Sequence, residues 1–258
     1  MPVRFSVGFI PERPILQNEL SPERIHGLFF SIIGNKLAEE LHKPSKIKPF
    51  CIGIPNLLKE SNKFERIFLR ISLLDENLFP RVLSSILLNN EDIYISGIKL
   101  RKILKPFIDE RWIKSYDSLV KHVKPDKTII FDFKTPTSFK KGDKDYPIPD
   151  PTLIFKSLIR KWCAFSPIPI NVNLRNAINN DIEIMGVWIR TKKISFSKVG
   201  KLTGFVGRVV FYIDSEDIEI IKWINILGKF SEFAGIGRKT TMGFGMVRFT
   251  NTIAYSSI

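Results

Sequence analysis

The spacing of hydrophobic residues predicts two successive units with the same order of strands and helices. Alternating hydrophobic and polar residues indicate strands, and hydrophobic residues three or four positions apart indicate helices. The first half then contains a strand at 3–10, a helix at 22–41, strands at 50–54 and 64–73, a helix at 78–88 and a strand at 93–104. The second half contains a strand at 128–133, a helix at 151–165, strands at 183–196 and 204–213, a helix at 218–233 and a strand at 245–249.

Each half has the order β-α-β-β-α-β, which is typical of the ferredoxin-like fold. Ser21-Pro22 and Asp150-Pro151 supply an N-cap and an N1 proline for the first helix of each half. We therefore predict an α+β protein with two tandem ferredoxin-like, RRM-like domains. The N-terminal domain spans 1–110, the C-terminal domain spans 126–258, and 111–125 form the linker.

The charge balance narrows the class of partner. The chain has 258 residues, with 40 Lys and Arg against 26 Asp and Glu, a net charge of +14. A folded domain this basic is expected to bind a polyanion, which is a nucleic acid or an acidic membrane surface. No apolar run is long enough to span a membrane, and no amphipathic helix has the broad basic face of a membrane-surface protein. The composition favours nucleic acid.

Two further features bear on compartment and metal content. Cys51 and Cys163 are too few for a disulfide framework or a four-cysteine zinc site. The first residues, MPVRFSVGFIPERP, lack a cleavable hydrophobic segment. We expect a cytoplasmic protein.

The most specific segment is a glycine-rich loop between the last helix and the last strand. It reads GIGRKTTMGFG and contains Gly235, Gly237, Arg238, Lys239, Thr240, Thr241, Gly243 and Gly245. Glycine permits positive φ angles, and consecutive amides in such a loop form an anion-binding concavity. The cations and hydroxyls between the glycines suit a phosphate. A purely structural turn is the alternative, but a turn rarely needs four glycines around a basic centre.

A second basic segment coincides with the predicted hairpin of the second half. Residues 186–208 include Arg190, Lys192 and Lys193 and contain no acidic residue. A hairpin tip there would project cations suited to an RNA stem. The alternative is a solvated hairpin; the absence of Asp and Glu favours RNA.

The glycine loop resembles the G-x-G-x5-G-x-G signature of the RAMP superfamily of CRISPR-associated proteins. The whole chain is similar to the endoribonuclease of that superfamily that cuts CRISPR repeat transcripts into guide RNAs. The other stretches that carry the resemblance are Leu41-His42 with Lys48-Pro49-Phe50, Thr135-Pro136-Thr137, Ser157 to Trp162, and Gly204 to Gly207.

The resemblance implies cleavage of RNA without a metal ion or another cofactor. The 2′-OH before the scissile phosphate attacks it and leaves a 2′,3′-cyclic phosphate and a 5′-OH. This chemistry needs in-line positioning, acid and base catalysis, and cations for the transition state.

The resemblance also assigns roles to residues. His42 matches the general acid/base at the end of the first helix, and Lys48 matches the lysine that stabilises the transition state. Lys46 is the reserve candidate for Lys48. Some relatives carry a tyrosine where this chain has Phe30, and His26, one turn earlier, is either its substitute or an ordinary helix-face histidine.

A different class of function stays open. A non-catalytic RAMP subunit that scaffolds a guide-RNA complex would share the fold, the charge and the glycine loop. His42 together with Lys48 favours the enzyme. The expected partner is CRISPR repeat RNA, with a second copy of the chain and other subunits of a guide-RNA effector complex as further candidates. The third histidine, His122, lies in the predicted linker without a motif around it.

Overall fold

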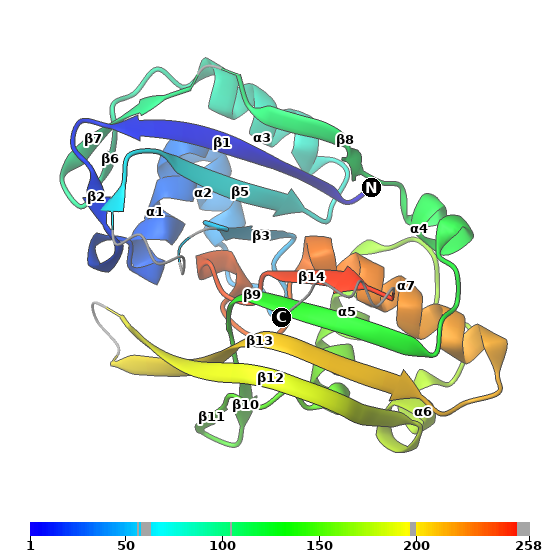
Figure 1. Ribbon diagram of the computed structural model, residues 1–258. Coiled ribbons are helices and arrows are strands. Elements are labelled where there is room, and N and C mark those ends of the chain that lie inside the picture. Colours follow the sequence, from blue (N-terminus) through cyan, green and yellow to red (C-terminus); the bar gives the residue numbers. More distant parts are fainter. Residues whose placement is uncertain (56, 58–62, 104, 197–199, 252–258) are drawn as a thin grey trace.

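The computed structural model describes residues 1–55, 57, 63–103, 105–196 and 200–251. It has two α+β units, and in each unit the helices cover one face of an antiparallel sheet (Figure 1). In the second unit, buried side chains of strands and helices meet in one core that is rich in Phe and Trp, whereas the core of the first unit is mostly Ile, Leu and Phe.

The first unit is built on a sheet with the strand order β3-β5-β1-β7-β6, to which β8 adds by pairing with β1. Its strands and helices are β1 (Val3–Pro11), β2 (Ile15–Leu16), a 3-10 turn η1 (Gln17–Glu19), α1 (Pro22–Ile33), α2 (Asn35–His42), β3 (Phe50–Gly53), β4 (Lys63–Phe64), β5 (Ile67–Leu73), α3 (Leu78–Leu88), β6 (Ile93–Ile95), β7 (Ile98–Lys102) and β8 (Phe107–Ile113).

The second unit is built on a four-stranded sheet with the order β12-β13-β9-β14. Its elements are α4 (Tyr116–His122), β9 (Thr128–Thr137), β10 (Phe139–Lys141), β11 (Lys144–Tyr146), α5 (Pro151–Phe165), α6 (Leu174–Asn180), β12 (Ile182–Ser195), β13 (Lys201–Ile213), α7 (Ile218–Ala234), a 3-10 turn η2 (Thr240–Met242) and β14 (Val247–Thr250).

Both units have the ferredoxin-like topology that the hydrophobic pattern predicts. In each, the first strand lies between the third and the fourth, and the second strand pairs with the third. The caps are also confirmed, because Ser21 accepts from the amide of Arg24 and Asp150 accepts from the amide of Leu153. The protein is therefore an α+β protein with two tandem ferredoxin-like domains.

Three predicted elements are divided in the structure. The predicted helix at 22–41 ends at Gly34, whose φ of +71° no helix accommodates, and α2 starts afresh. The predicted strand at 93–104 is the β6–β7 hairpin, because Ser96 and Gly97 both have positive φ. The predicted strand at 64–73 is divided between β4, which pairs with β2, and β5. Hydrophobic alternation continues through such turns and cannot reveal them.

The segment that connects the units holds the end of β8 and all of α4. The Tyr116 hydroxyl donates to the carbonyl of Leu74 at 2.9 Å, and the Tyr116 ring packs edge-on against Trp162. This segment therefore contacts both units. The division at 110 and 126 stays a prediction. Among the described residues, no helix is both long enough and apolar enough to cross a membrane.

Candidate functional site

Two histidines lie side by side on the helices of the first unit. His26 is on α1, and His42 is the last residue of α2. The break at Gly34 redirects the chain between them, and their ring centroids are 5.5 Å apart. Phe30 contacts both rings, with centroid separations of 4.7 Å to His26 and 4.1 Å to His42. Phe30 thus packs against both members of a histidine pair.

The glycine loop of the second unit fixes the tautomer of His26. Nδ1 of His26 lies 2.6 Å from the carbonyl oxygen of Thr241. A carbonyl only accepts, so Nδ1 carries the proton, and Nε2 of the neutral ring keeps its lone pair. Burial lowers the pKa of His26, the nearby His42, Lys239 and Lys48 lower it further, and the bond to Thr241 opposes them. A neutral imidazole with a free Nε2 is suited to accept a proton near pH 7.

Lys48 lies between the end of α2 and the start of β3, and its side chain reaches back to the end of α2. Lys48 is half-buried, and its Nζ donates to the carbonyls of Leu41 at 2.7 Å and of Lys43 at 2.6 Å. These bonds satisfy carbonyls at the helix end and hold the segment that presents His42. An ammonium group has three donors, so one N–H remains for another ligand. Lys46 is exposed nearby.

Close backbone approaches explain two glycines of the loop. Gly237 and Gly245 have φ angles of +81° and +71°, and Gly235 and Gly243 are also positive. A Cβ on Gly237 would lie 2.5 Å from the Ser138 carbonyl oxygen, and one on Gly245 would overlap the Ile236 carbonyl oxygen. Neither position has room for a side chain. Glycine is therefore required at both positions by the fold of the loop, whether or not the loop binds a ligand.

Most loop amides already have acceptors inside the protein. The donors and acceptors are Gly235 to Ser231 O, Ile236 to Gly245 O, Gly237 to Ser157 Oγ, Arg238 to Ser138 O, Met242 and Phe244 to Lys239 O, and Gly245 to Pro136 O. The expected concavity of free amides is therefore largely engaged by the protein itself. Charged side chains and hydroxyls are what this loop offers to a phosphate.

The polar side chains of the loop differ in their partners. Arg238 forms an ion pair with Asp145 at 2.6 Å. Lys239 is exposed, and its Nζ lies 5.6 Å from the ring centre of Phe196. Thr240 is buried, and Thr241 is half-buried and presents its carbonyl to His26. Lys239 is thus the loop cation that is both accessible and close to the histidines.

A buried lysine forms hydrogen bonds to the glycine loop and to the end of α7. Lys161 of α5 is only 9% exposed. Its Nζ donates to the carbonyl of Ala234, to that of Gly235 at 3.3 Å and to Thr240 Oγ1 at 3.2 Å. Burial lowers the pKa of Lys161. The sequence resemblance included this residue, but its partners are 73 to 79 positions away and no local pattern reveals them.

The basic hairpin and the glycine loop lie next to each other. A groove of about 380 Å³ is bordered by the start of α1 around Ser21, by residues 192–195 of β12, and by residues 242–244. Phe196 stacks on Phe244 with a centroid separation of 5.9 Å, which joins the hairpin to the loop. Lys192 and Lys193 line this groove, whereas Arg190 lies farther along β12 and is exposed. The hairpin tip at 197–199 lies outside the described residues.

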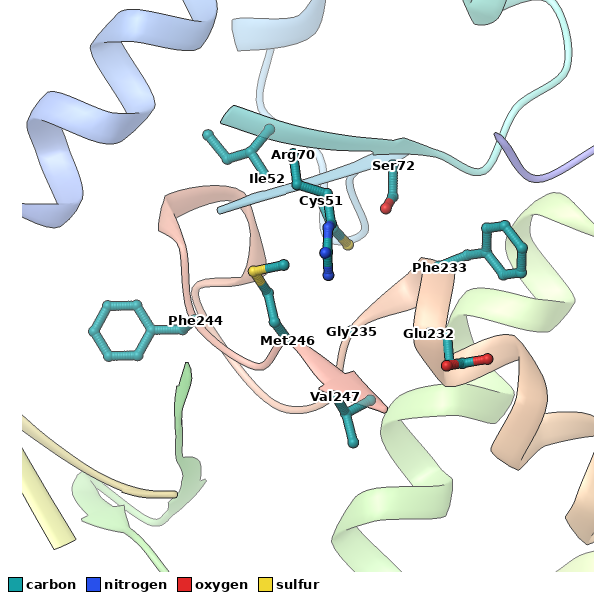
Figure 2. Close-up of a pocket in the computed structure, with 10 residues that line it drawn as sticks. All are labelled: Cys51, Ile52, Arg70, Ser72, Glu232, Phe233, Gly235, Phe244, Met246 and Val247. Carbon is teal, nitrogen blue, oxygen red and sulfur yellow. The ribbon is translucent and has the colours of Figure 1, made fainter. Parts of the chain in front are cut away.

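A second, smaller pocket lies where the two units meet. Figure 2 shows it between β3 and β5 on one side and the end of α7 with the glycine loop on the other, with the Arg70 side chain pointing into it. Its volume of about 20 Å³ has room for roughly one water molecule. It is therefore part of the domain contact and no substrate site. In the described ranges, no group of three or more His, Cys, Asp and Glu side chains is arranged to hold a metal ion.

A family model matches the sequence of the second unit, and two curated relatives match part of the chain. The family model described as CRISPR-associated endoribonuclease Cas6 matches residues 131–247. The CRISPR-associated endoribonucleases Cas6 of two Mycobacterium tuberculosis strains are 29% identical over 121 residues, which is 45% of this chain. The matched region spans 37% of the length of these curated relatives.

Structure comparisons cover both units. The Cas6 (TTHB231) product complex is 27% identical, with a TM-score of 0.81 over 97% of this chain and 100% of the other. Thermus thermophilus Cas6 (TTHB231) is 26% identical, with a TM-score of 0.75 over 97% of this chain and 98% of the other. A Cas6-related protein from Pyrococcus furiosus, 18% identical with a TM-score of 0.57, shares the fold over 97% of this chain and 99% of its own. The resemblance to the Cas6 endoribonucleases is confirmed.

Proposed function

We propose that this chain is an endoribonuclease that cuts CRISPR repeat transcripts into guide RNAs without a metal ion. The observation that carries the proposal is the histidine pair, whose rings are 5.5 Å apart beside Lys48 and the glycine loop. The similarity to Cas6 enzymes supports the substrate class. The 2′-OH before the scissile phosphate is the nucleophile, and the products carry a 2′,3′-cyclic phosphate and a 5′-OH.

The two histidines suit complementary roles in this reaction. His26 has a free Nε2 and a lowered pKa, so it is suited to take the proton of the 2′-OH. His42 is exposed at the end of α2 and is suited to protonate the leaving 5′-oxygen. His42 thus keeps the acid/base role that the resemblance implies, with His26 as its partner.

Cations around the pair stabilise the charge that develops on the phosphate. Lys48 retains one donor beyond its two carbonyl bonds, and Lys239 of the glycine loop is exposed and close enough to lower the pKa of His26. Fixed cations aimed at a developing negative charge are a large source of rate enhancement. Arg190, Lys192 and Lys193, with the glycine-loop residues, are the proposed RNA-binding surface.

The test is cleavage of the cognate repeat RNA in EDTA by three histidine variants. His42→Ala and His26→Ala should each slow single-turnover cleavage on the order of 10²–10⁴-fold, because each removes an acid or base. His122→Ala is the matched control, since this exposed histidine is bonded to Ser118 on α4, away from the pair. Its rate should equal that of the unaltered chain.

Substrate changes separate the mechanism from its rivals. A single 2′-deoxy nucleotide before the cut should abolish cleavage and leave binding nearly intact, since phosphates supply most of the affinity. Cleavage of that substrate at the normal rate, or a strict requirement for Mg²⁺, would refute the proposed chemistry. Tight binding of the repeat without any cleavage would favour the scaffold subunit.

A further inference from the structure

A pocket in the second unit lies between α4, α7 and the end of β14, and we call it the α4 pocket. Figure 1 shows α4 beside α7, and α7 also packs against β14. The α4 pocket has a volume of about 580 Å³, and it shares no lining residue with the groove beside the glycine loop. Pockets that bind small molecules have volumes of roughly 300–1,000 Å³. The α4 pocket therefore has room for a ligand as large as a nucleotide, and it plays no part in the proposed cleavage.

The rim of the α4 pocket is positively charged. Lys114 precedes α4, Lys124 follows it and Lys229 lies on α7, and no acidic residue is among the described residues that line the pocket. Asp117 is the acidic residue of α4, but its carboxylate pairs with Lys121 at 2.9 Å, and neither of these two residues lines the pocket. The charge of the rim therefore favours an anion.

The three lysines of the rim differ in their partners. Nζ of Lys229 pairs with Glu232 at 2.5 Å, which holds Lys229 in place, and Glu232 does not line the α4 pocket. Within the described ranges, neither Lys114 nor Lys124 forms an ion pair. An ammonium group has three N–H donors, so all three lysines keep donors for a ligand. Charge-assisted hydrogen bonds from such donors to a phosphate are strong.

The floor of the α4 pocket is apolar. Leu119 of α4 and Phe249 of β14 are 4% and 7% exposed, and Val123 is half-buried. The Phe249 ring packs closely against α7 at Gly228, where a Cβ would overlap the ring. A site for inorganic phosphate alone has no use for apolar surface, whereas a planar base gains free energy by covering it. The floor and the rim together match a ligand that has both a base and a phosphate.

We propose that the α4 pocket binds a nucleoside phosphate, with the base against the apolar floor and the phosphates at the lysine rim. Asn251 also lines the pocket, and its side-chain amide supplies both a donor and an acceptor for the edge of a base. The same chemistry binds a free nucleotide and a nucleotide of an RNA chain, and the two sources are separated by experiment.

Calorimetric titration of the full chain with adenosine 5′-diphosphate (ADP) tests the rim. Lys114→Ala and Lys124→Ala should each weaken ADP binding at least about tenfold, because each removes a charged donor to the phosphates. Lys121→Ala is the matched control, since Lys121 lies on the same helix outside the pocket, and it should bind ADP like the unaltered chain. His42→Ala should also bind ADP like the unaltered chain, which separates the pocket from the histidine pair.

Two partial ligands test the floor and the rim separately. Adenosine and inorganic phosphate should each bind at least about tenfold more weakly than ADP, because adenosine lacks the groups for the rim and phosphate lacks the base for the floor. Thermal unfolding of the lysine variants at the Tm of the unaltered chain excludes a folding defect as the cause of weaker binding.

An RNA titration identifies the source of the nucleotide. Repeat RNA with single-stranded flanks that displaces ADP, and that binds more weakly to Lys114→Ala/Lys124→Ala, assigns the pocket to an RNA chain. Loss of ADP binding with unchanged RNA binding in that variant assigns it to a free nucleotide. Absence of ADP binding at millimolar concentration, or ADP and RNA binding that are both unchanged in the lysine variants, would overturn the proposal. The cleavage rates of the histidine variants test the proposed function independently of these results.

Discussion

Replacing Gly245 by alanine should damage the glycine loop more than its φ angle alone would predict. A left-handed conformation costs an L-residue about 1–2 kcal/mol. The new Cβ would also overlap the Ile236 carbonyl oxygen, so this peptide must shift and weaken the Ile236 N–H bond to Gly245, 2.9 Å long, worth roughly 1 kcal/mol. The expected loss of about 2–3 kcal/mol corresponds to a fall in Tm of roughly 4–12 °C.

Gly142 provides a matched control for this substitution. Its φ is +59°, and a Cβ there would meet nothing within 4 Å, so Gly142→Ala tests the conformational cost alone, about 1–2 kcal/mol. Thermal unfolding measures the Tm of the two variants. The rate of single-turnover cleavage of repeat RNA measures the effect of each substitution on the candidate site. Gly245→Ala should also cleave more slowly, because Thr241, which orients His26, lies in the same loop. Equal Tm values and equal rates for the two variants would refute the argument from close approach.

The remaining predictions concern His26 and Lys161. Because burial lowers the folded-state pKa of His26, its neutral form contributes stability that is fully present above about pH 6.5 and is lost as pH falls through the folded pKa. Urea unfolding should therefore show that the free energy of unfolding falls less below pH 6.5 in His26→Ala than in the unaltered chain. In the pH profile of the unaltered chain, the fall in kcat/KM on the acidic side should lie below pH 6.5. A variant with the same pH dependence of stability as the unaltered chain would contradict this. Lys161→Met should lower stability by about 2 kcal/mol and slow cleavage, because it leaves the loop carbonyls without a donor, whereas Lys156→Met, exposed on the same helix, should change stability by less than about 0.5 kcal/mol. Equal stability and rate in these two variants would show that Lys161 does not support the loop.

The fold was accessible from the sequence because its signals are local. The spacing of hydrophobic residues can be recognised within a few positions, and so can the helix caps at Ser21 and Asp150. The element order β-α-β-β-α-β also occurs in both halves of the chain. The divisions at Gly34 and at Ser96-Gly97 were missed because a positive φ leaves little trace in hydrophobic spacing. A glycine inside a helical pattern and the Ser-Gly pair were the available signals.

The candidate site was only partly accessible because its geometry depends on distant contacts. The resemblance implies roles for His42 and Lys48, which come from one short stretch of chain, and these roles stay predictions. The role of His26 could not be decided there, since it depends on the carbonyl of Thr241, 215 positions away. The sequence likewise gives no sign that the amides of the glycine loop are hydrogen-bonded. Several of their acceptors belong to distant residues such as Pro136 and Ser157.

The histidine pair is completed by the contact between the two units. His26 and His42 belong to the first unit, but the tautomer of His26, the proposed base, is fixed by Thr241 of the second. Cys51 of β3 donates its thiol hydrogen to the carbonyl of Ala234 at 2.6 Å, and Arg4 of β1 donates to the carbonyl of Glu232 at 3.0 Å. These bonds anchor the end of α7, from which the glycine loop starts. Since a base in the wrong tautomer cannot accept the 2′-OH proton, the proposed mechanism requires this contact between the domains.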